Sequence, residues 1–447
     1  MSNNTINASE NNRFFGGVTN GLTRIFDRYL PDPLVIVIVL TIMIMLACVS
    51  FRGDAPADIL GYWMDGFWSL HGFAMQMVLI LVAGFVVATT PMFKSLTLRI
   101  ASSARTPGRA VIIVTVVSLL ASWLNWGIGL VVGAVLAKEL AKRVPFVDYR
   151  LLIASAYSGF LVWHAGLSGS IPLSLATPGH FLEGSVGLIP TSETLFSPLN
   201  IGLVVAIFVA LPLTNYLMMK NSKTVSFTDF KDEPKPSNDD VSRPAERLEH
   251  SIWPALLISS AGIAAVVLYV VKGGGLNLNV IIFSLIFVGI GLHKNLSQFL
   301  AQINEAVKGA SGIIIQFPFY AGLMGIMSQS GLAGDLAQMF VNISTADTLP
   351  VWSFLSAGVI NMFVPSGGGQ WAVQGPIVME AAQALNADIS TVAMAFAWGD
   401  SWTNMLQPFW ALPALAIAGL KARDIMGFCA VVLAVSGIII SLALLLF

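Results

Sequence analysis

The chain has 447 residues, of which 56% are hydrophobic and only 11% are charged. Soluble domains carry about 25% charged residues, so this composition excludes an ordinary soluble protein and predicts an all-α polytopic membrane protein. The net charge of −1 gives no indication of a nucleic-acid partner. The two cysteines, Cys48 and Cys429, lie in apolar segments and predict neither a disulfide framework nor a metal cluster.

Residues 1–32 form a polar N-terminal arm that contains Arg13, Arg24 and Arg28. The arm lacks the compact charged and apolar regions of a secretory signal peptide. Its apolar side chains recur at roughly helical spacing, so we expect a cytoplasmic amphipathic arm on the membrane surface.

Eleven charge-poor segments follow the arm, and each is long enough to cross about 30 Å of hydrocarbon. The charged, proline-containing stretch 220–250 divides them and predicts a cytoplasmic linker. The linker separates a first membrane repeat, 33–219, from a connecting helix, 251–275, and a second repeat, 276–447. The segments span 33–51, 67–90, 110–137, 151–179, 194–219, 251–271, 276–292, 309–334, 348–379, 389–420 and 425–447.

Basic residues in the loops indicate how the segments are oriented. Loops 91–109 and 138–150 each hold four Lys or Arg, so both are expected in the cytoplasm. Segment 110–137 lies between them and must enter and leave on one side, which predicts a re-entrant hairpin bent between Asn125 and Gly129. The amphipathic stretch 295–308 is expected to lie flat on the same surface.

A second hairpin is predicted at 348–379, which contains no charged residue. The run Pro365-Ser366-Gly367-Gly368-Gly369 lies in its middle and is incompatible with a regular helix. Backbone groups freed within hydrocarbon must be satisfied by protein or a water-lined cavity, and such breaks are typical of binding sites in secondary transporters. The flanking loops 335–347 and 380–388 hold no Lys or Arg, so this hairpin should enter from outside.

Two hairpins and nine full crossings place the N-terminus in the cytoplasm and the C-terminus in the periplasm of a bacterial inner membrane. The second repeat is then inverted relative to the first, and 151–179 and 389–420 are equivalent broken helices. We therefore predict an inverted-repeat transporter with two re-entrant hairpins and two broken helices. Two similarities between the halves of the sequence agree with this prediction. Asn125 and Asn361 each precede a glycine-rich bend. The spacing of Tyr157-Ser158-Gly159 through Pro172 is similar to that of Ala397-Trp398-Gly399 through Pro413.

The polar breaks of these four segments are expected to meet near the membrane centre. Backbone N–H groups and the N-termini of half-helices attract anions, and no Lys or Arg lies deep in a segment to pair with a carboxylate. We therefore predict a singly charged carboxylate held by dipoles and hydroxyl groups. The expected substrate-binding residues are Asn125, Gly127, Gly129, Ser168, Gly169, Ser170, Ser366, Gly367, Gly368 and Gly369.

Asp400 is the only acid inside a segment. An intramembrane acid is costly and rare, which favours a cation ligand or a proton carrier; the alternative is a structural acid satisfied by Ser401 or Thr403. His164 either binds substrate or carries a proton, or it is a hydrogen-bonded core histidine. The expected cation-coupling residues are Asp400, Asn361, Asn404 and Thr403, with Na⁺ at Asn125, Asn361 and Asp400 or with H⁺ in its place, and no other cofactor is expected.

Long motifs over nearly the whole chain resemble the bacterial short-chain fatty acid transporter family, of the acetoacetate and butyrate type, in the ion transporter superfamily. The resemblance implies inverted repeats with paired hairpins, elevator-like movement, and uptake of short monocarboxylates coupled to Na⁺ or H⁺. One departure is Trp163-His164, which interrupts an expected glycine-rich run and bears on substrate size or on the role of His164. The motifs are Asp65-Gly66-Phe67-Trp68, Asn125-Trp126-Gly127, Ser168-Gly169-Ser170, Ala176-Thr177-Pro178-Gly179, Val364-Pro365-Ser366-Gly367-Gly368-Gly369 and Gln407-Pro408-Phe409-Trp410.

Three other functions remain open on the sequence. A cation/proton antiporter on the same scaffold would show Na⁺-dependent proton flux without an organic substrate. An intramembrane enzyme is not expected, because the chain contains neither His-Glu-x-x-His nor Gly-x-Ser-x-Gly. A channel is disfavoured by hairpins closed at both faces. The expected partners are a small monocarboxylate and membrane lipid, with a homodimer left open.

Overall fold

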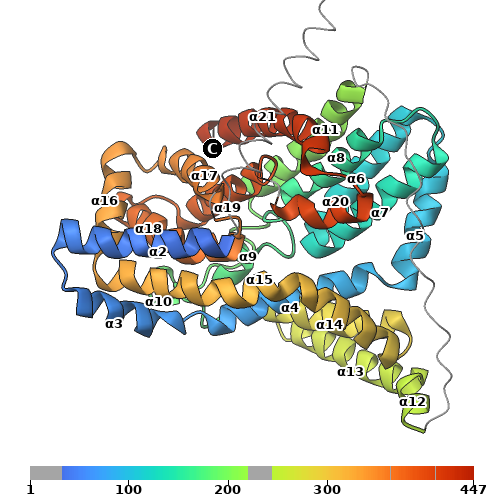
Figure 1. The fold of residues 1–447 in the computed structure, drawn as a ribbon, viewed down its shortest axis with the longest axis horizontal. Helices are drawn as coiled ribbons and strands as arrows, with labels where there is room; N and C mark the ends of the chain where they lie inside the picture. Colours follow the sequence, from blue (N-terminus) through green and yellow to red (C-terminus); the bar gives the residue numbers. More distant parts are fainter. Residues whose placement is uncertain (1–32, 220–243, 363, 408, 447) are drawn as a thin grey trace, which may run out of the picture.

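The computed structural model describes residues 33–219, 244–362, 364–407 and 409–446, and all regular structure within them is helical (Figure 1). The predicted arm, 1–32, and the stretch 220–243 of the predicted linker lie outside the described residues.

The first half runs from α2 (Pro33–Ala47), with its π-helical end η1 (Cys48–Arg52), to α11. Its helices are α3 (Pro56–Phe67), α4 (His71–Ala88), α5 (Pro91–Ser103), α6 (Pro107–Leu124), α7 (Trp126–Arg143), α8 (Tyr149–Ser158), the 3-10 turn η2 (Gly159–Val162), α9 (Ser170–Leu175), α10 (Glu183–Val186) and α11 (Pro198–Met219).

The second half begins with α12 (Pro244–Glu249) and α13 (Ile252–Val271). It continues with α14 (Leu278–His293), α15 (Leu296–Gln329), α16 (Leu332–Ile343), α17 (Leu349–Asn361), α18 (Gly367–Leu385), α19 (Ile389–Thr403), the 3-10 turn η3 (Phe409–Ala411), α20 (Leu412–Ala418) and α21 (Ala422–Leu446).

The helices break at both predicted bends, and whether each pair re-enters the membrane stays a prediction. Only Asn125 separates α6 from α7, and a short non-helical stretch containing Pro365 and Ser366 separates α17 from α18. In Figure 1, α5, α6 and α7 lie towards the right, whereas α16, α17 and α18 lie towards the left. The two tips therefore approach the centre from opposite ends of the molecule.

Seven helices among the described residues are long and apolar enough to cross a membrane. Six of them match predicted crossings: α2 with η1, α4, α11, α13, α15 and α21; the seventh, α6, is the first arm of a hairpin. The other three predicted crossings are α14, with 16 residues, and the two broken segments α8–α9 and α19–α20. The chain is thus a multi-pass membrane protein with the predicted breaks.

One local prediction is wrong. The stretch 295–308 is not a separate surface helix, because it begins α15, a continuous helix of 34 residues that Asn295 caps by accepting a hydrogen bond from the Gln298 N–H. Leu296, Phe299 and Ile303 pack against α4 and α14, whereas Leu300 and Val307 are exposed. A further helix, α3, lies between the first two predicted segments and packs on α15 where Gly66 meets Gly325.

The two broken helices start in the same way. Asp148 accepts a hydrogen bond from the Arg150 N–H and caps α8, and Asp388 accepts one from the Thr391 N–H and caps α19. Short polar side chains at this position satisfy N–H groups that have no partner within the helix. Eleven residues after each cap comes a glycine, Gly159 in the first half and Gly399 in the second.

These two glycines pack on equivalent places of the two hairpins. A Cβ at Gly159 would lie 2.5 Å from the backbone carbon of Ser118, and a Cβ at Gly399 would lie 2.1 Å from the carbonyl oxygen of Phe354. Ser118 precedes Asn125 by seven residues, and Phe354 precedes Asn361 by seven. Each broken helix thus crosses the first arm of its own hairpin at the same level, as an internal repeat requires.

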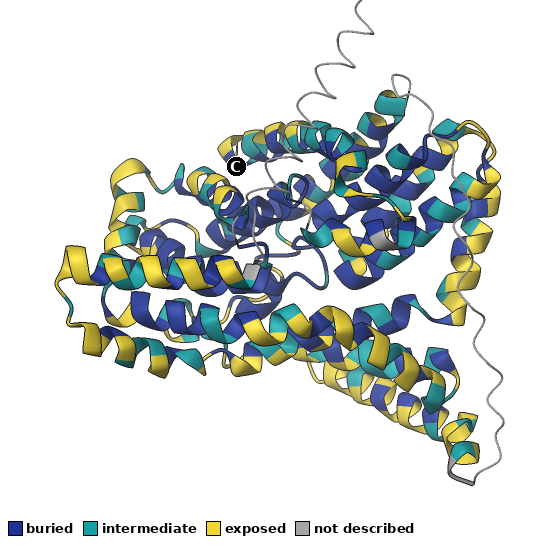
Figure 2. Ribbon diagram, in the orientation of Figure 1, coloured by how far each residue is buried: buried dark blue, intermediate teal, exposed yellow. Residues whose placement is uncertain are grey.

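Contacts between the halves follow the same symmetry, since α4 packs with α15 and α11 packs with α21. Buried residues concentrate where the hairpins and broken helices meet, whereas α2 and α13 have many exposed positions (Figure 2). Large apolar side chains such as Ile42, Leu257 and Val267 are exposed there, as is typical of a lipid-facing surface. At one end of the molecule Arg52 pairs with Asp335, two residues that the charge pattern places outside.

Candidate functional site

The tip of the first hairpin is held by its own asparagine. The Asn125 side-chain oxygen accepts a hydrogen bond from the Ile128 N–H at 3.1 Å and so caps α7. A Cβ at Gly84 on α4 would lie only 2.0 Å from the same oxygen, so α4 needs a glycine at this position. The next N–H, that of Trp126, donates to the Ser168 hydroxyl at 2.9 Å.

The first broken helix folds around this tip. The Leu167 N–H donates to the Trp123 carbonyl at 2.7 Å, and a Cβ at Gly166 would meet that carbonyl oxygen at 2.1 Å. At Gly169 a Cβ would lie 2.3 Å from the His164 carbonyl oxygen, which explains why this tight turn requires glycine. The turn places the Trp163 and His164 side chains at the centre of the molecule.

The tip of the second hairpin lies against these two side chains. Ser366 caps α18 by accepting a hydrogen bond from the Gly369 N–H at 3.3 Å. A Cβ at Gly367 would lie 2.3 Å from His164 Nε2 and 2.6 Å from Cη2 of Trp163, and a Cβ at Gly369 would lie 2.6 Å from the Tyr320 ring. The glycines therefore allow the tip to contact the first broken helix and α15, and their role in binding substrate stays a prediction.

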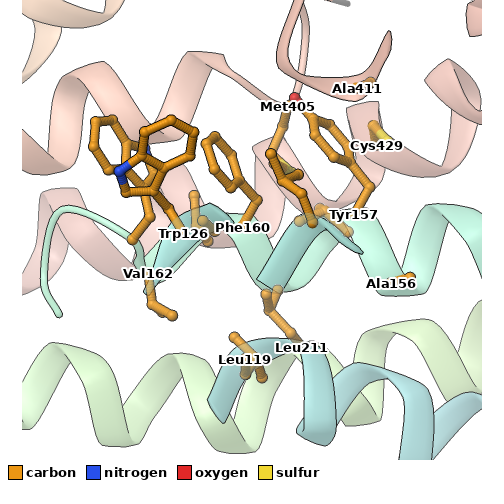
Figure 3. Close-up of a cluster of buried hydrophobic side chains, with 14 of the residues drawn as sticks. Leu119, Trp126, Ala156, Tyr157, Phe160, Val162, Leu211, Met405, Ala411 and Cys429 are labelled. Atoms are coloured by element: carbon orange, nitrogen blue, oxygen red, sulfur yellow. The ribbon is translucent and has the colours of Figure 1, made fainter. Parts of the chain in front are cut away.

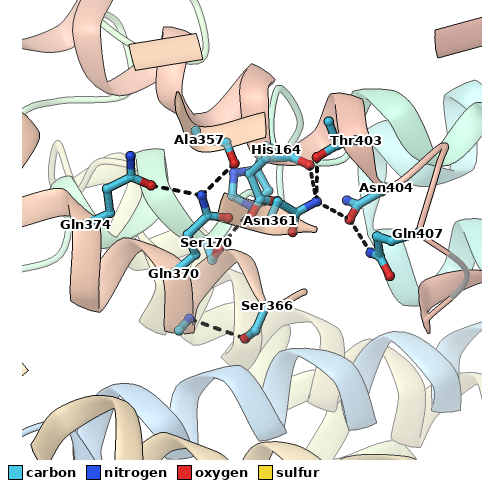
Figure 4. Close-up of polar contacts among 12 residues, drawn as sticks. His164, Ser170, Ala357, Asn361, Ser366, Gln370, Gln374, Thr403, Asn404 and Gln407 are labelled. Atoms are coloured by element: carbon cyan, nitrogen blue, oxygen red, sulfur yellow. Dashed lines mark hydrogen bonds and ion pairs between the residues drawn. The ribbon is translucent and has the colours of Figure 1, made fainter. Parts of the chain in front are cut away.

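Asn361 connects the second hairpin to the second broken helix (Figure 4). Its side-chain nitrogen lies 2.8 Å from the Asp400 carbonyl oxygen, 3.0 Å from Thr403 Oγ1 and 3.0 Å from Asn404 Oδ1. Gln407 also donates to Asn404 Oδ1, at 2.8 Å. The four predicted cation-coupling residues thus form one buried cluster.

The Asp400 carboxylate is only 1% exposed and contacts the other half of the molecule. Its Oδ1 lies 3.7 Å from His164 Nε2, and the Ser170 hydroxyl lies 3.3 Å from the same nitrogen. Within the described structure neither Asp400 oxygen has a hydrogen-bond partner, and the Asn361 side-chain oxygen has none either. Unpaired buried oxygens are costly, so this group is suited to a ligand that supplies positive charge.

The alternative role for Asp400, a structural acid satisfied by its neighbours, finds no support in these contacts. The Ser401 hydroxyl is itself buried without a partner in the described part of the chain, and Thr403 Oγ1 faces Asn361. The donor set fits a hard cation such as Na⁺, which prefers carboxylate and amide oxygens. No group of three or more His, Cys, Asp or Glu suitable for a metal occurs among the described residues.

Other predicted residues lie around the tips without joining this cluster. Gly127 packs on the backbone of α4, and Gly129 packs on Ser122 in the opposite arm of the hairpin. Gly368 faces the rings of Phe73 and Phe317. The described contacts of Asn125 are with α4 and α7, so a Na⁺ site shared by Asn125, Asn361 and Asp400 stays a prediction.

Several polar residues of the centre were not predicted. The Tyr157 hydroxyl donates to the Asn404 carbonyl at 2.7 Å, and Asn200 on α11 donates to the Ala165 carbonyl while its oxygen accepts from Trp398. Gln374 accepts a hydrogen bond from Gln370, one turn earlier on α18. The available signal was an amide or hydroxyl inside an otherwise apolar helix, which has to find a polar partner.

Comparison with known families now adds to this geometry. A family model described as short chain fatty acid transporter matches residues 15–447. The chain belongs to the short chain fatty acid transporter family. The resemblance indicated by its motifs is therefore confirmed, as is its place among transporters.

Two bacterial relatives carry the provisional name short-chain fatty acid transporter. The protein of Escherichia coli (strain K12) is 44% identical over 443 residues, which cover 97% of this chain and 100% of that protein. The protein of Haemophilus influenzae (strain ATCC 51907) is 43% identical over 426 residues, which cover 92% of this chain and 95% of that protein.

Two solved structures share the fold of this family member. The YdaH transporter of Alcanivorax borkumensis, described as having an unusual topology, aligns with a TM-score of 0.59 and 16% identity over 92% of this chain and 98% of that one. MtrF of Neisseria gonorrhoeae, described with a class of antimetabolite efflux pumps, aligns with a TM-score of 0.59 and 15% identity over 95% and 97%. The predicted all-α transporter fold is confirmed.

Proposed function

We propose that this protein carries short-chain monocarboxylates, such as butyrate or acetoacetate, across the bacterial inner membrane together with a cation. Membership of the short chain fatty acid transporter family supports this substrate class. The observation that carries the proposal is the buried centre, where the tips of two opposed hairpins meet two broken helices. Such an arrangement is typical of the binding site of a secondary transporter and not of an enzyme.

The charges of the centre suit an anion and a cation that travel together. The only acid inside the predicted segments is Asp400, and those segments hold no Lys or Arg. Near the tips, backbone N–H groups of α7 and α18 and the positive ends of these helices attract a carboxylate. A cation at Asp400 and Asn361 balances that charge, so neither ion has to cross the membrane alone.

Uptake of labelled butyrate and acetoacetate into proteoliposomes tests this function. A Na⁺ gradient and a pH gradient are imposed separately, and protein-free liposomes give the background. Concentrative uptake under one gradient identifies the coupling ion. No uptake of either acid under both gradients would overturn the proposed substrate class.

The second candidate is a Na⁺/H⁺ antiporter on the same scaffold, because Asp400 is a buried carboxylate without hydrogen-bond partners among the described residues. A pH-sensitive dye trapped in the same proteoliposomes distinguishes the two. Na⁺-driven proton flux in the absence of any organic acid would favour the antiporter.

The proposed orientation has a cytoplasmic N-terminus, a periplasmic C-terminus and a first hairpin that re-enters from the cytoplasm. Cysteines placed at Arg105 and Lys142, on either side of that hairpin, should both react only with a reagent supplied from the cytoplasm. A cysteine at Asp347, beside the second hairpin, should react only from outside. Reaction of Arg105→Cys and Lys142→Cys from opposite sides would exclude the re-entrant hairpin.

A further inference from the structure

We propose that four aromatic rings at the centre, Trp126, Phe160, Trp163 and Trp410, form the subsite that binds both the carboxylate and the alkyl chain of the substrate. This inference rests on the proposed function, and it names the neutral groups that recognise the anion. The four residues are called the aromatic cluster below.

The aromatic cluster is assembled from three of the elements that meet at the centre. Trp126 is the first residue of α7, Phe160 and Trp163 belong to the first broken helix, and Trp410 belongs to η3 in the second. The ring of Trp126 lies 6.0 Å from that of Trp163 and 5.2 Å from that of Trp410, measured between ring centroids. Phe160 lies 5.6 Å from Trp163 and 6.0 Å from Trp410.

Each ring therefore has two others beside it, and together the four rings form one apolar patch at the centre. Figure 3 shows Trp126 of α7 beside Phe160, with Tyr157 next to Phe160 on the first broken helix. Aromatic faces are large, rigid apolar surfaces that hold an alkyl chain at little cost in conformational entropy. Three of the four side chains are almost fully buried, and Trp410 is half-buried.

Two of these rings have a hydrogen-bond donor that is not used. The indole N–H groups of Trp163 and Trp410 are buried and find no acceptor in the described structure, nor does the side-chain nitrogen of Asn125, next to Trp126. By contrast, the indole of Trp398 donates to Asn200, and that of Trp402 donates to the Leu433 carbonyl. Trp63 and Trp371 also have unpaired indoles, but they belong to α3 and α18 and not to this cluster.

An unpaired buried donor costs free energy, and a carboxylate oxygen would remove that cost. The cluster adjoins the N-terminus of α7, whose dipole favours negative charge. Unused acceptors of the centre belong to Asp400, Asn361 and Gln370, and the Asn404 side-chain nitrogen beside them is an unused donor. His164 lies between the two groups, because its ring centroid is 3.5 Å from that of Trp163 and its Nε2 is 3.7 Å from Asp400. The unused indole donors of the aromatic cluster thus adjoin the unused acceptors of the second half.

Trp163 also contacts the second hairpin, at the position where Gly367 leaves room for its ring. Both hairpin tips therefore meet this one side chain, since Trp126 belongs to the first tip. Because the rings already contact one another, any alkyl chain has to part them, and a longer chain has to part them further. The aromatic cluster accordingly sets an upper limit on chain length, and short acids are preferred.

The test compares tryptophan-to-phenylalanine variants, which keep an aromatic ring and remove only the N–H. Trp163→Phe and Trp410→Phe should each raise the half-saturating concentration of butyrate uptake about tenfold or more, because a hydrogen bond to a charged group is lost. Trp402→Phe is the matched control, since its indole is satisfied outside the cluster. Phe160→Leu should keep butyrate uptake and shift the preference towards hexanoate. Thermal unfolding of each purified variant identifies those that merely fold poorly.

The outcomes separate this inference from the proposed function. If the wild type takes up butyrate and the two cluster variants match Trp402→Phe in affinity and chain-length preference, the subsite is overturned and the function stands. If the wild type takes up no monocarboxylate, the proposed function falls. Butyrate titrated against the detergent-purified protein, followed by tryptophan fluorescence, then decides the subsite: a response that Trp163→Phe weakens supports it, and no response overturns it.

Discussion

The two broken helices share a backbone plan but carry different chemistry. Measured from their capping aspartates, Phe160 occupies the position of Asp400, and His164 occupies that of Asn404. Trp163 corresponds in the same way to Thr403. At these equivalent positions the first broken helix thus carries rings, whereas the second carries a carboxyl group, a hydroxyl group and an amide. The comparison teaches that an internal repeat builds a symmetric frame whose two sides can bind partners of opposite character.

The hairpin asparagines differ in a similar way. Asn125 accepts a hydrogen bond from the start of its own hairpin's second arm, and its nitrogen is unpaired within the described structure. Asn361 donates across to the second broken helix, and its oxygen is unpaired there. The first tip therefore has a spare donor and the second a spare acceptor, which agrees with an anion on one side and a cation on the other.

We expect the largest effect from replacing Asp400, because the equivalent position of the first broken helix holds Phe160 and no acid. Asp400→Asn should reduce gradient-driven accumulation of substrate to background, because the amide keeps the size of the side chain but removes its negative charge. Exchange of substrate without a gradient should persist. Asp388→Asn, at the start of the same helix, is the control, because asparagine also caps helices well. Normal accumulation and cation dependence in Asp400→Asn would make this residue a structural acid.

The second effect concerns the hairpin asparagines. Asn361→Asp should destabilise the protein by about 3–5 kcal/mol, because a carboxylate would face the carbonyl and side-chain oxygens that now receive an N–H. Asn125→Asp should cost less, about 1–3 kcal/mol, because the new carboxylate is fully buried but still caps α7, and aspartate caps a helix about as well as asparagine. Thermal unfolding in detergent measures both. Equal losses would remove the distinction between the two tips.

A smaller effect tests the symmetric frame itself. Gly159→Ala and Gly399→Ala should each cost about 1–3 kcal/mol, because in both cases the new methyl group meets backbone atoms of the facing hairpin arm. Gly202, which has open space around it, gives the control substitution to alanine. A loss in only one half, measured as the unfolding midpoint, would contradict equivalent packing.

Neighbouring glycines of the second tip give a finer comparison. Gly367→Ala should lower the uptake rate about tenfold, because its methyl group would occupy the space of the His164 and Trp163 rings, a misfit of about 1.4 kcal/mol. Gly368→Ala should stay within about twofold of the wild type, since its methyl group would lie 3.2 Å from two phenylalanine rings that can shift slightly. Similar rates in the two variants would mean that contact with Trp163 and His164 is unimportant.

The sequence predicted the breaks of this fold well, because a run of proline and glycine inside a charge-free segment cannot continue a regular helix. It did not predict that α15 is continuous, since an amphipathic stretch such as 295–308 looks the same whether it faces lipid headgroups or α4. Gly127 and Gly129 show the corresponding limit for the site. Glycine permits close approach of any neighbour, so its spacing alone does not tell a ligand from a helix.

The sequence alone indicates Asp400 as a candidate cation-coupling residue. It does not predict the contact between Asp400 and His164. An acid in an apolar segment stands out by its cost alone, but a contact between residues 236 positions apart depends on how two repeats fold together. The sequence alone does not predict the aromatic cluster, for the same reason. Each of its rings is an ordinary apolar residue in its own segment, and only the fold places the four together.

Because α15 is longer than a bilayer is thick, we expect the thickness of the surrounding bilayer to affect transport. At 1.5 Å per residue, its 34 residues extend about 51 Å, well beyond about 30 Å of hydrocarbon, so the helix must tilt or protrude. Pro318 interrupts its hydrogen bonding to Ile314 and borders an apolar hollow of about 170 Å³ that leaves room to bend. Close to this proline, Phe317 and Tyr320 contact the second hairpin tip. A thinner membrane should therefore increase the tilt, displace that tip and change uptake, which reconstitution into lipids of graded acyl length would measure.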